Sequence, residues 1–123
     1  MGQLSFLIVF LFALFSTVKA QDPVESDPKH YKVEFQNSQV RVLRISYGPH
    51  EKSTMHEHPE GVVVFVTDGE FRFALAGGKK ETRRGKAGQT MWTAREKHAP
   101  ENLSDKPFEA VLIEMRTKQA TTQ

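Results

Sequence analysis

The sequence predicts a single all-β domain whose short strands close into a sandwich or barrel. Between Tyr31 and Met115, apolar and polar residues alternate in short runs, and turn residues separate these runs at close intervals. No window of about 11 residues holds the 3.6-residue repeat of an amphipathic helix. The chain has 123 residues, a length that fits one jelly-roll barrel and not two.

The beginning of the chain predicts a secretory signal peptide over residues 1–20. Residues 4–15 are apolar apart from Ser5, and Val18-Lys19-Ala20 places small residues at the usual cleavage positions. We therefore expect cleavage after Ala20, and a protein exported to a periplasm or to the external medium, with no stable membrane association. A transmembrane anchor is the rival interpretation, but the apolar run is short for a hydrocarbon layer of ~30 Å, and Lys19 closes it.

After cleavage we expect an arm, a domain and a tail. Residues 21–30 are polar and contain two prolines, which predicts a flexible N-terminal arm, and residues 117–123 are expected to be a disordered tail after a domain over 31–116. Without Lys19, the 17 Lys and Arg residues become 16, against 15 Asp and Glu. This near balance argues against nucleic acid or an acidic membrane as the main partner.

The chain contains no cysteine, so no disulfide can stabilise this small domain. A core, a metal ion or a second subunit must then hold the fold together. We expect a homodimer, because pairing two sheets edge to edge would cover their exposed strands. The arm from Asp22 to Tyr31 could extend across the partner.

The expected strands cover residues 31–35, 40–47, 62–67, 70–76, 79–86, 89–93 and 108–115. The run Val62 to Thr67 is continuously apolar, which suits a strand buried on both faces. Asp68-Gly69 after it is a strong hairpin signal, so the next strand should fold back over it. Gly77-Gly78 marks another tight turn.

The alternation also predicts core positions, namely Val64, Phe71, Phe73, Trp92, Leu112 and Ile113. Trp92 could instead form a wall of a binding pocket, but its large apolar area favours the core. Glu114 lies within an apolar strand and needs a partner if it is buried, and Arg44 is a candidate.

Three of the five histidines form a pattern that fits a metal ion. His56 and His58 are two residues apart, which places both side chains on one face of a strand, and His98 follows 40 residues later. Neutral imidazoles from two strands would make a three-nitrogen site for Fe, Zn, Mn or Ni. An ordinary exposed His-x-His loop is the alternative. His30 and His50 fit no pattern and are expected to be exposed.

Two runs of the sequence resemble the motifs of small single-domain cupins. The run from Gly48 to Gly69 resembles the first cupin motif, G-x5-H-x-H-x3-4-E-x6-G, and the run from Gly88 to Asn102 resembles the second, which ends in H-x3-N. The chain departs from these motifs in the spacing after Gly48, in having Thr93 and Arg95 before His98, and in having Val62 where the family supplies a glutamate ligand.

The resemblance implies a cupin-type jelly-roll barrel with a tri-histidine metal site and no carboxylate ligand. If Pro59 does not break the register, Val62 should point toward the metal beside His56 and His58. Glu101 and Asn102 could orient a ligand ring. The catalytic residues stay undefined.

Three functions remain open. Tri-histidine sites resemble those of thiol dioxygenases and diketone-cleaving dioxygenases, so an iron-dependent dioxygenase acting on a small organic molecule is the first expectation. A non-catalytic cupin that binds a small molecule or a metal is the second. A lyase or isomerase that uses the metal as a Lewis acid is the third, and the absence of an evident acid–base pair disfavours it.

Overall fold

The computed structural model describes Gly2 and residues 21–116. The expected tail over 117–123, and the expected signal peptide except for Gly2, lie outside the described residues. Within the described part of the chain, no helix has the length and apolar character that a membrane crossing requires.

The regular secondary structure of the described residues is nine strands and one short helix. The elements are α1 (Pro23–Ser26), β1 (Tyr31–Gln36), β2 (Val40–Tyr47), β3 (His56–His58), β4 (Gly61–Phe65), β5 (Gly69–Leu75), β6 (Lys80–Gly85), β7 (Thr90–Thr93), β8 (Glu96–Asn102) and β9 (Phe108–Met115). Strand β8 is an addition to the strands expected from the sequence, because Pro100 and its polar neighbours are typical of a turn.

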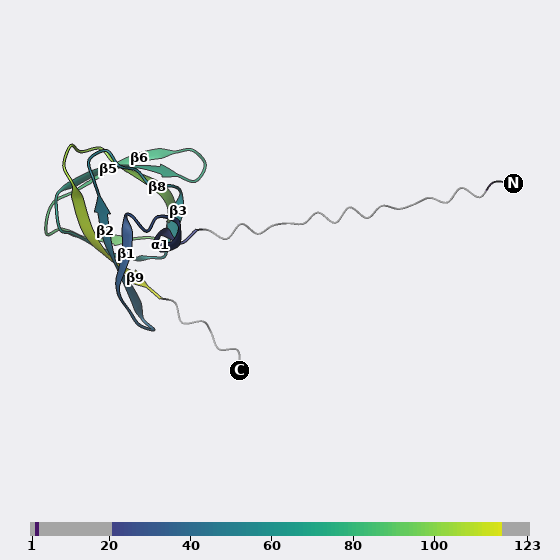
Figure 1. The fold of residues 1–123 in the computed structure, drawn as a ribbon, viewed down its shortest axis with the longest axis horizontal. Coiled ribbons are helices and arrows are strands. Elements are labelled where there is room, and N and C mark those ends of the chain that lie inside the picture. Colours follow the sequence, from purple (N-terminus) through teal and green to yellow (C-terminus); the bar gives the residue numbers. More distant parts are fainter. Residues whose placement is uncertain (1, 3–20, 117–123) are drawn as a thin grey trace.

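Two antiparallel sheets curve around a common interior, as Figure 1 shows. The larger sheet has the strand order β1-β2-β9-β4-β7, and the smaller has the order β3-β8-β5-β6. This arrangement confirms the predicted all-β barrel. Neighbours in a sheet come from distant parts of the sequence, so most of the packing depends on long-range pairing.

The Asp68-Gly69 signal does not make the expected hairpin. Strand β4 belongs to the larger sheet and β5 to the smaller one, so the chain crosses between the sheets at this turn. A side chain at Gly69 would begin 2.5 Å from the ring of Phe108, which explains a glycine there by close packing between the layers. The Gly77-Gly78 turn does join the β5–β6 hairpin, and both glycines have φ of 85°.

The core lies between the two sheets and is rich in aromatic rings. Its buried members are Tyr31, Leu43, Tyr47, Phe71, Phe108, Ala110 and Leu112, with Phe73 packed against them. Phe71, Phe73 and Leu112 are therefore confirmed. Val64, Ile113 and Trp92 are corrections, because strand alternation turns them to the outer face, and Trp92 is 59% exposed.

The segment expected to be an arm instead folds onto its own barrel. Asp22 caps α1 through Val24 N, and α1 lies against β1 and β3 (Figure 1). His30, expected to be exposed, is buried: its ring stacks on Tyr47 at 4.1 Å between centroids and its Nδ1 lies 2.6 Å from Asp27 Oδ2. The exposed position of His50 is confirmed.

Candidate metal centre

The three histidines of the sequence pattern meet in the structure at one point inside the barrel. His56 and His58 come from β3, and His98 comes from β8, where it pairs directly with His56 in the antiparallel ladder. One nitrogen of each ring lies within 4.8 Å of the corresponding nitrogens of the other two. His56 is fully buried and His58 is 6% exposed. The rings therefore form a compact, shielded cluster.

Hydrogen bonds fix the same nitrogen, Nδ1, on all three rings. His56 Nδ1 lies 2.9 Å from the carbonyl oxygen of Thr54, His58 Nδ1 lies 2.7 Å from Glu114 Oε2, and His98 Nδ1 lies 2.6 Å from Glu96 Oε1. In a neutral ring, Nδ1 can donate to its oxygen only if Nε2 is the bare, lone-pair nitrogen. The three Nε2 atoms are thereby left to bind an ion, which is the arrangement of metal-ligating histidines.

A buried nitrogen within this cluster has no partner among the described residues. His56 Nε2 is inaccessible and makes no hydrogen bond. Burying an unpaired polar atom costs about 1–3 kcal/mol, so we expect a partner for this nitrogen. A divalent ion between the three rings would accept the lone pair of His56 Nε2. The donor set therefore fits a metal such as Zn, Fe, Mn or Ni.

An arginine holds each of the two supporting carboxylates. Glu96 accepts two hydrogen bonds of 2.8 Å from Arg83, which also bonds Glu81 at 2.6 Å. This series, His98–Glu96–Arg83–Glu81, connects β8 with β6. The hydrogen bonds from Arg83 lower the pKa of Glu96 to about 2, so this carboxylate stays charged and accepts a hydrogen bond from Nδ1–H of His98.

A second series runs through the other sheet. Glu114, which is 1% exposed, accepts from His58 and from Arg41 Nε at 2.6 Å. Arg41 also pairs with Asp22 at 2.8 Å. The series His58–Glu114–Arg41–Asp22 therefore connects the metal centre with the cap of α1. Arg44, the partner expected for Glu114, instead pairs with Glu34 and Glu109 on the outer face.

Two of the rings stay neutral over the physiological range. Burial, together with the neighbouring His58 and His98 rings, lowers the pKa of His56 to about 3. Burial likewise lowers the pKa of His98 to about 4, although its bond to Glu96 opposes this shift. Neutral imidazole is the form that binds a metal ion, so protons compete weakly for these two rings above about pH 5.

The residues expected to orient a ligand ring lie elsewhere. Glu101 pairs with Arg72 at 2.9 Å on the surface. Asn102 is fully buried, but its amide bonds the carbonyl oxygens of Gly48 and Lys106, both at 3.0 Å, and so holds loops together. In the described part of the chain, the carboxylates that support the rings are Glu96 and Glu114.

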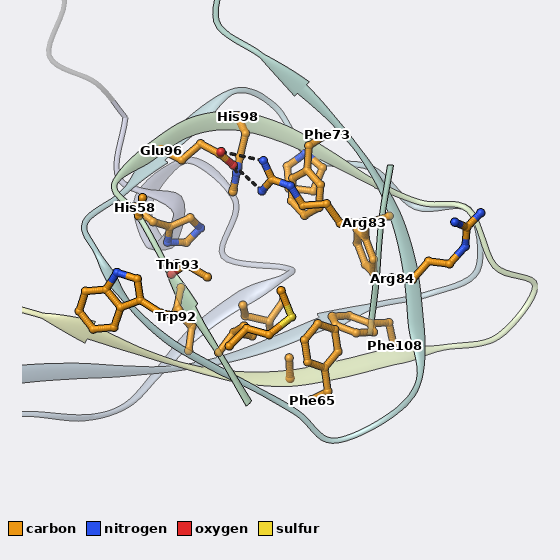
Figure 2. A pocket seen from close by; sticks show the side chains of 18 residues that line it. His58, Phe65, Phe73, Arg83, Arg84, Trp92, Thr93, Glu96, His98 and Phe108 are labelled. Carbon is orange, nitrogen blue, oxygen red and sulfur yellow. Dashed lines mark hydrogen bonds and ion pairs between the residues drawn. The ribbon is translucent and has the colours of Figure 1, made fainter. Parts of the chain in front are cut away.

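An apolar cavity of about 370 Å³ leads to the histidines. Figure 2 shows His58 and His98 at one end and the rings of Phe65, Phe73 and Phe108 around the rest. The cavity lining contains His58 and His98 but not the fully buried His56. An ion held by the three Nε2 atoms would therefore turn its open positions toward this cavity.

No carboxylate faces the ion position from β4. Val62, expected to point inward, pairs with Ile113 and Trp92 and lies on the outer face. The turn at Pro59 moves the chain into the other sheet and shifts the alternation by one residue. Val63 lines the cavity instead, and it is equally unable to bind a metal.

The titratable side chains that line the cavity are all engaged in ion pairs or hydrogen bonds. Besides the two series above, Arg84 at the mouth pairs with Glu70. Arg83 stacks over the ring of Phe73 with its guanidinium carbon 4.6 Å from the ring centroid. The described cavity wall therefore offers apolar contact and leaves no unpaired acid or base beside the metal position.

Comparisons with known proteins agree with this fold. The profile of the cupin domain matches residues 43–114. A cupin domain from Bordetella pertussis is similar at 26% identity, with a TM-score of 0.66 over 71% of this chain and 92% of that one. A double-stranded β-helix domain protein from Klebsiella pneumoniae is 18% identical, with a TM-score of 0.54 over 72% of this chain and 84% of that one.

A larger enzyme also shares the fold. The DMSP lyase of Ruegeria pomeroyi is 20% identical, with a TM-score of 0.50 over 70% of this chain and 42% of that one. No curated protein matches the chain. Because the cupin profile spans more than half of the sequence and the strands follow the cupin arrangement, the chain belongs to the cupin family.

Proposed function

We propose that this chain is an exported tri-histidine metalloenzyme of the dioxygenase type that acts on a small, largely apolar organic molecule. The observation that carries the proposal is the set of three Nε2 atoms, each freed by a hydrogen bond at Nδ1, at the end of an apolar cavity. Export is supported by the N-terminal sequence pattern of residues 1–20.

The ligand set supports redox chemistry at the ion. Three neutral imidazoles leave a divalent ion with its full charge and with open positions on one side. Iron bound there would supply the oxidation chemistry. The protein's own part is to fix the three rings, to exclude bulk water and to place an organic molecule against the open side.

The cavity supports a particular substrate class. Its wall is mostly aromatic and aliphatic, and Arg83 is already bonded to two carboxylates. A free carboxylate on the substrate would find no unpaired cation within the described wall. We therefore expect an uncharged or weakly acidic molecule that binds the ion through a chelating pair of oxygen atoms or through a sulfur atom and buries an apolar remainder.

A non-catalytic cupin that binds a small molecule is the second candidate. It is favoured by the same wall, because the described cavity holds no unpaired acid or base for proton transfer. This feature counts against a lyase or isomerase, which needs such a group. A dioxygenase can instead work at the ion and the substrate alone.

Oxygen uptake separates the two candidates. Protein reconstituted with Fe²⁺ under anaerobic conditions should, once dioxygen is admitted, consume it when given an apolar 1,3-diketone or a small thiol, whereas the Zn²⁺ form should bind the same compounds without uptake. The H98A variant serves as the control for iron free in solution. Binding without uptake across a panel of such compounds would favour the binding protein. Failure to take up any divalent ion would reject the dioxygenase and leave a metal-free binding protein.

A further inference from the structure

The outer face of the larger sheet is unusually apolar for a surface. Antiparallel sheets with one face in water normally alternate apolar residues inside with polar residues outside. Here the residues that the register places on the outer face of β2, β4 and β9 are mostly aliphatic: Val40, Val42, Val62, Val64, Val111, Ile113 and Met115. In the single chain these side chains are only half-buried.

One row of this face crosses all five strands. Phe35 pairs with Val42, Val42 with Ile113, Ile113 with Val62, and Val62 with Trp92. Residues paired across a sheet point to the same side. The two ends of the row are the most exposed, with Phe35 at 55% and Trp92 at 59%. Figure 2 shows the Trp92 ring at the edge of the cavity, away from Phe73 and Phe108.

The row reads the same from either end: aromatic, Val, Ile, Val, aromatic. Ile113 lies on β9, which is the central strand of the five. A two-fold axis that runs parallel to β9, over Ile113 and between the two faces, would place Ile113 over its own copy. It would also place Val42 over Val62 of the partner subunit, and Phe35 over Trp92 of the partner subunit. Such a surface is complementary to itself, which is the requirement for an isologous dimer.

Charge and size are also compatible with a second copy. Arg44 on this face pairs with Glu34 at 2.7 Å and with Glu109 at 3.3 Å. The register places Lys32 beside Arg44 on the edge strand β1, where its exposed side chain can keep its charge in solvent. Five strands about 4.8 Å apart and roughly 20 Å long project about 480 Å². Side-chain relief adds to this area, which otherwise lies below the ~800 Å² per partner of a standard interface, so the dimer would have a small interface.

We propose that two copies of this chain pack face to face through the Phe35–Val42–Ile113–Val62–Trp92 row, with the two-fold axis parallel to β9 and between the two faces. This explains why the run from Val62 has the composition of a strand buried on both faces, although a single chain covers only one. It also assigns a role to Trp92, since tryptophans carry a large share of the binding energy at protein interfaces. The edges of the sheets need not pair in this dimer.

The oligomeric state of wild type and of surface variants tests whether this face is the dimer interface. Sedimentation of the purified protein, with its N-terminus defined by mass spectrometry, should give a dimer at micromolar concentration. I113K should be a monomer, because it opposes two like charges across the axis, and W92K should dissociate at least about tenfold more readily. T82K, which adds the same charge to exposed β6, should remain a dimer. Circular dichroism and metal uptake should match wild type throughout. A monomeric wild type, or a dimeric I113K, would reject the proposal.

A pair of variants tests the axis. V62K and V42E should each be monomers, yet they should form a dimer when mixed, since one subunit's Lys would lie over the other's Glu while the second contact stays Val over Val. The emission of Trp92, the single tryptophan, should shift to shorter wavelength on mixing. If V62K and V42E stay monomeric together, the proposed packing is wrong.

Discussion

Two of the three histidine rings are each held by a carboxylate that an arginine holds in turn. The series from His98 ends at Glu81 and the series from His58 ends at Asp22. Each carboxylate is fixed from behind by a charged hydrogen bond, so an acceptor oxygen faces the ring. The ligand tautomer and ring orientation are thus set by the protein before an ion arrives, which reduces the cost of binding it.

Replacing Glu114 tests this account of His58. E114Q keeps the shape and an acceptor oxygen but removes the charge that pairs with Arg41. We expect divalent-metal affinity to fall about 10–100-fold, measured by competition with a chelator. E109Q is the matched control on the same strand, because Glu109 pairs with Arg44 on the outer face. Equal affinities for the two variants would show that Glu114 has no part in the site.

The histidines also predict how the stability of the metal-free protein depends on pH. The folded pKa values of His56 and His98, about 3 and about 4, lie below the unfolded value of about 6.5. Between those limits the unfolded chain binds more protons, so the free energy of unfolding should decrease as the pH falls from about 6.5 to 4, by several kcal/mol at most.

Urea denaturation of the metal-free protein at pH 7, 6, 5 and 4.5 measures this dependence. H98Q should lose part of it, while H50Q, at an exposed position, should keep all of it. A wild-type stability that is constant between pH 7 and 4.5 would contradict the burial of neutral rings.

The turn between β3 and β4 determines which side chains of β4 face the ion position. Strand β3 ends at His58 in the smaller sheet, and β4 begins at Gly61 in the larger one. The crossing changes which residues face inward, so Val63 lines the cavity while Val62 faces outward. The site therefore has three histidines on one side and an apolar wall opposite.

Supplying a carboxylate at the inward position should change the ion's environment. V63E should tighten divalent-metal binding by about tenfold or more, roughly 1.4 kcal/mol, because a fourth, anionic ligand becomes available. It should also destabilise the metal-free protein, since a buried carboxylate lacks a partner. V62E, one residue away on the outer face, is the control and should leave the metal affinity unchanged. Tightening by V62E alone would show that the strand faces are reversed.

Gly61 permits the close approach of β4 to β9. A Cβ at this position would overlap the carbonyl oxygen of Ile113. G61A should therefore cost about 1–3 kcal/mol or more of unfolding free energy, as overpacking does. G78A should cost about 1 kcal/mol of unfolding free energy. Position 78 has a φ of 85°, which is unfavourable for alanine, but a Cβ there would contact no atom within 4 Å. Thermal unfolding of both variants compares the two effects, and a smaller loss for G61A would contradict the packing.

At the scale of the whole molecule, local sequence patterns predict the class of fold and the three metal-site histidines. Alternation marks most strands, and the spacing of His56, His58 and His98 matches a motif whose members meet in the barrel. Both depend on residues near one another in the chain or on a known family pattern.

Features that depend on strand pairing are harder to predict. Arg41, and not Arg44, bonds Glu114, because the β2–β9 register places those two opposite each other on the inner face. Glu96 lies only two residues before His98, yet the sequence around Pro100 does not predict the strand β8 that aligns them. Trp92 has the large apolar side chain that is typical of a core residue, but it faces outward. All three follow from the register, which is set by pairing between distant segments.

The central claim is that His56, His58 and His98 together bind one divalent ion. The most direct measurement is the metal content of the reconstituted protein and of its H56A, H58A and H98A variants after gel filtration, with circular dichroism to verify the fold. We predict one ion per chain in the wild type and a substoichiometric content in each folded variant. If all three variants kept one ion per chain, other residues would bind the ion, and the assignment of the tri-histidine site would be wrong.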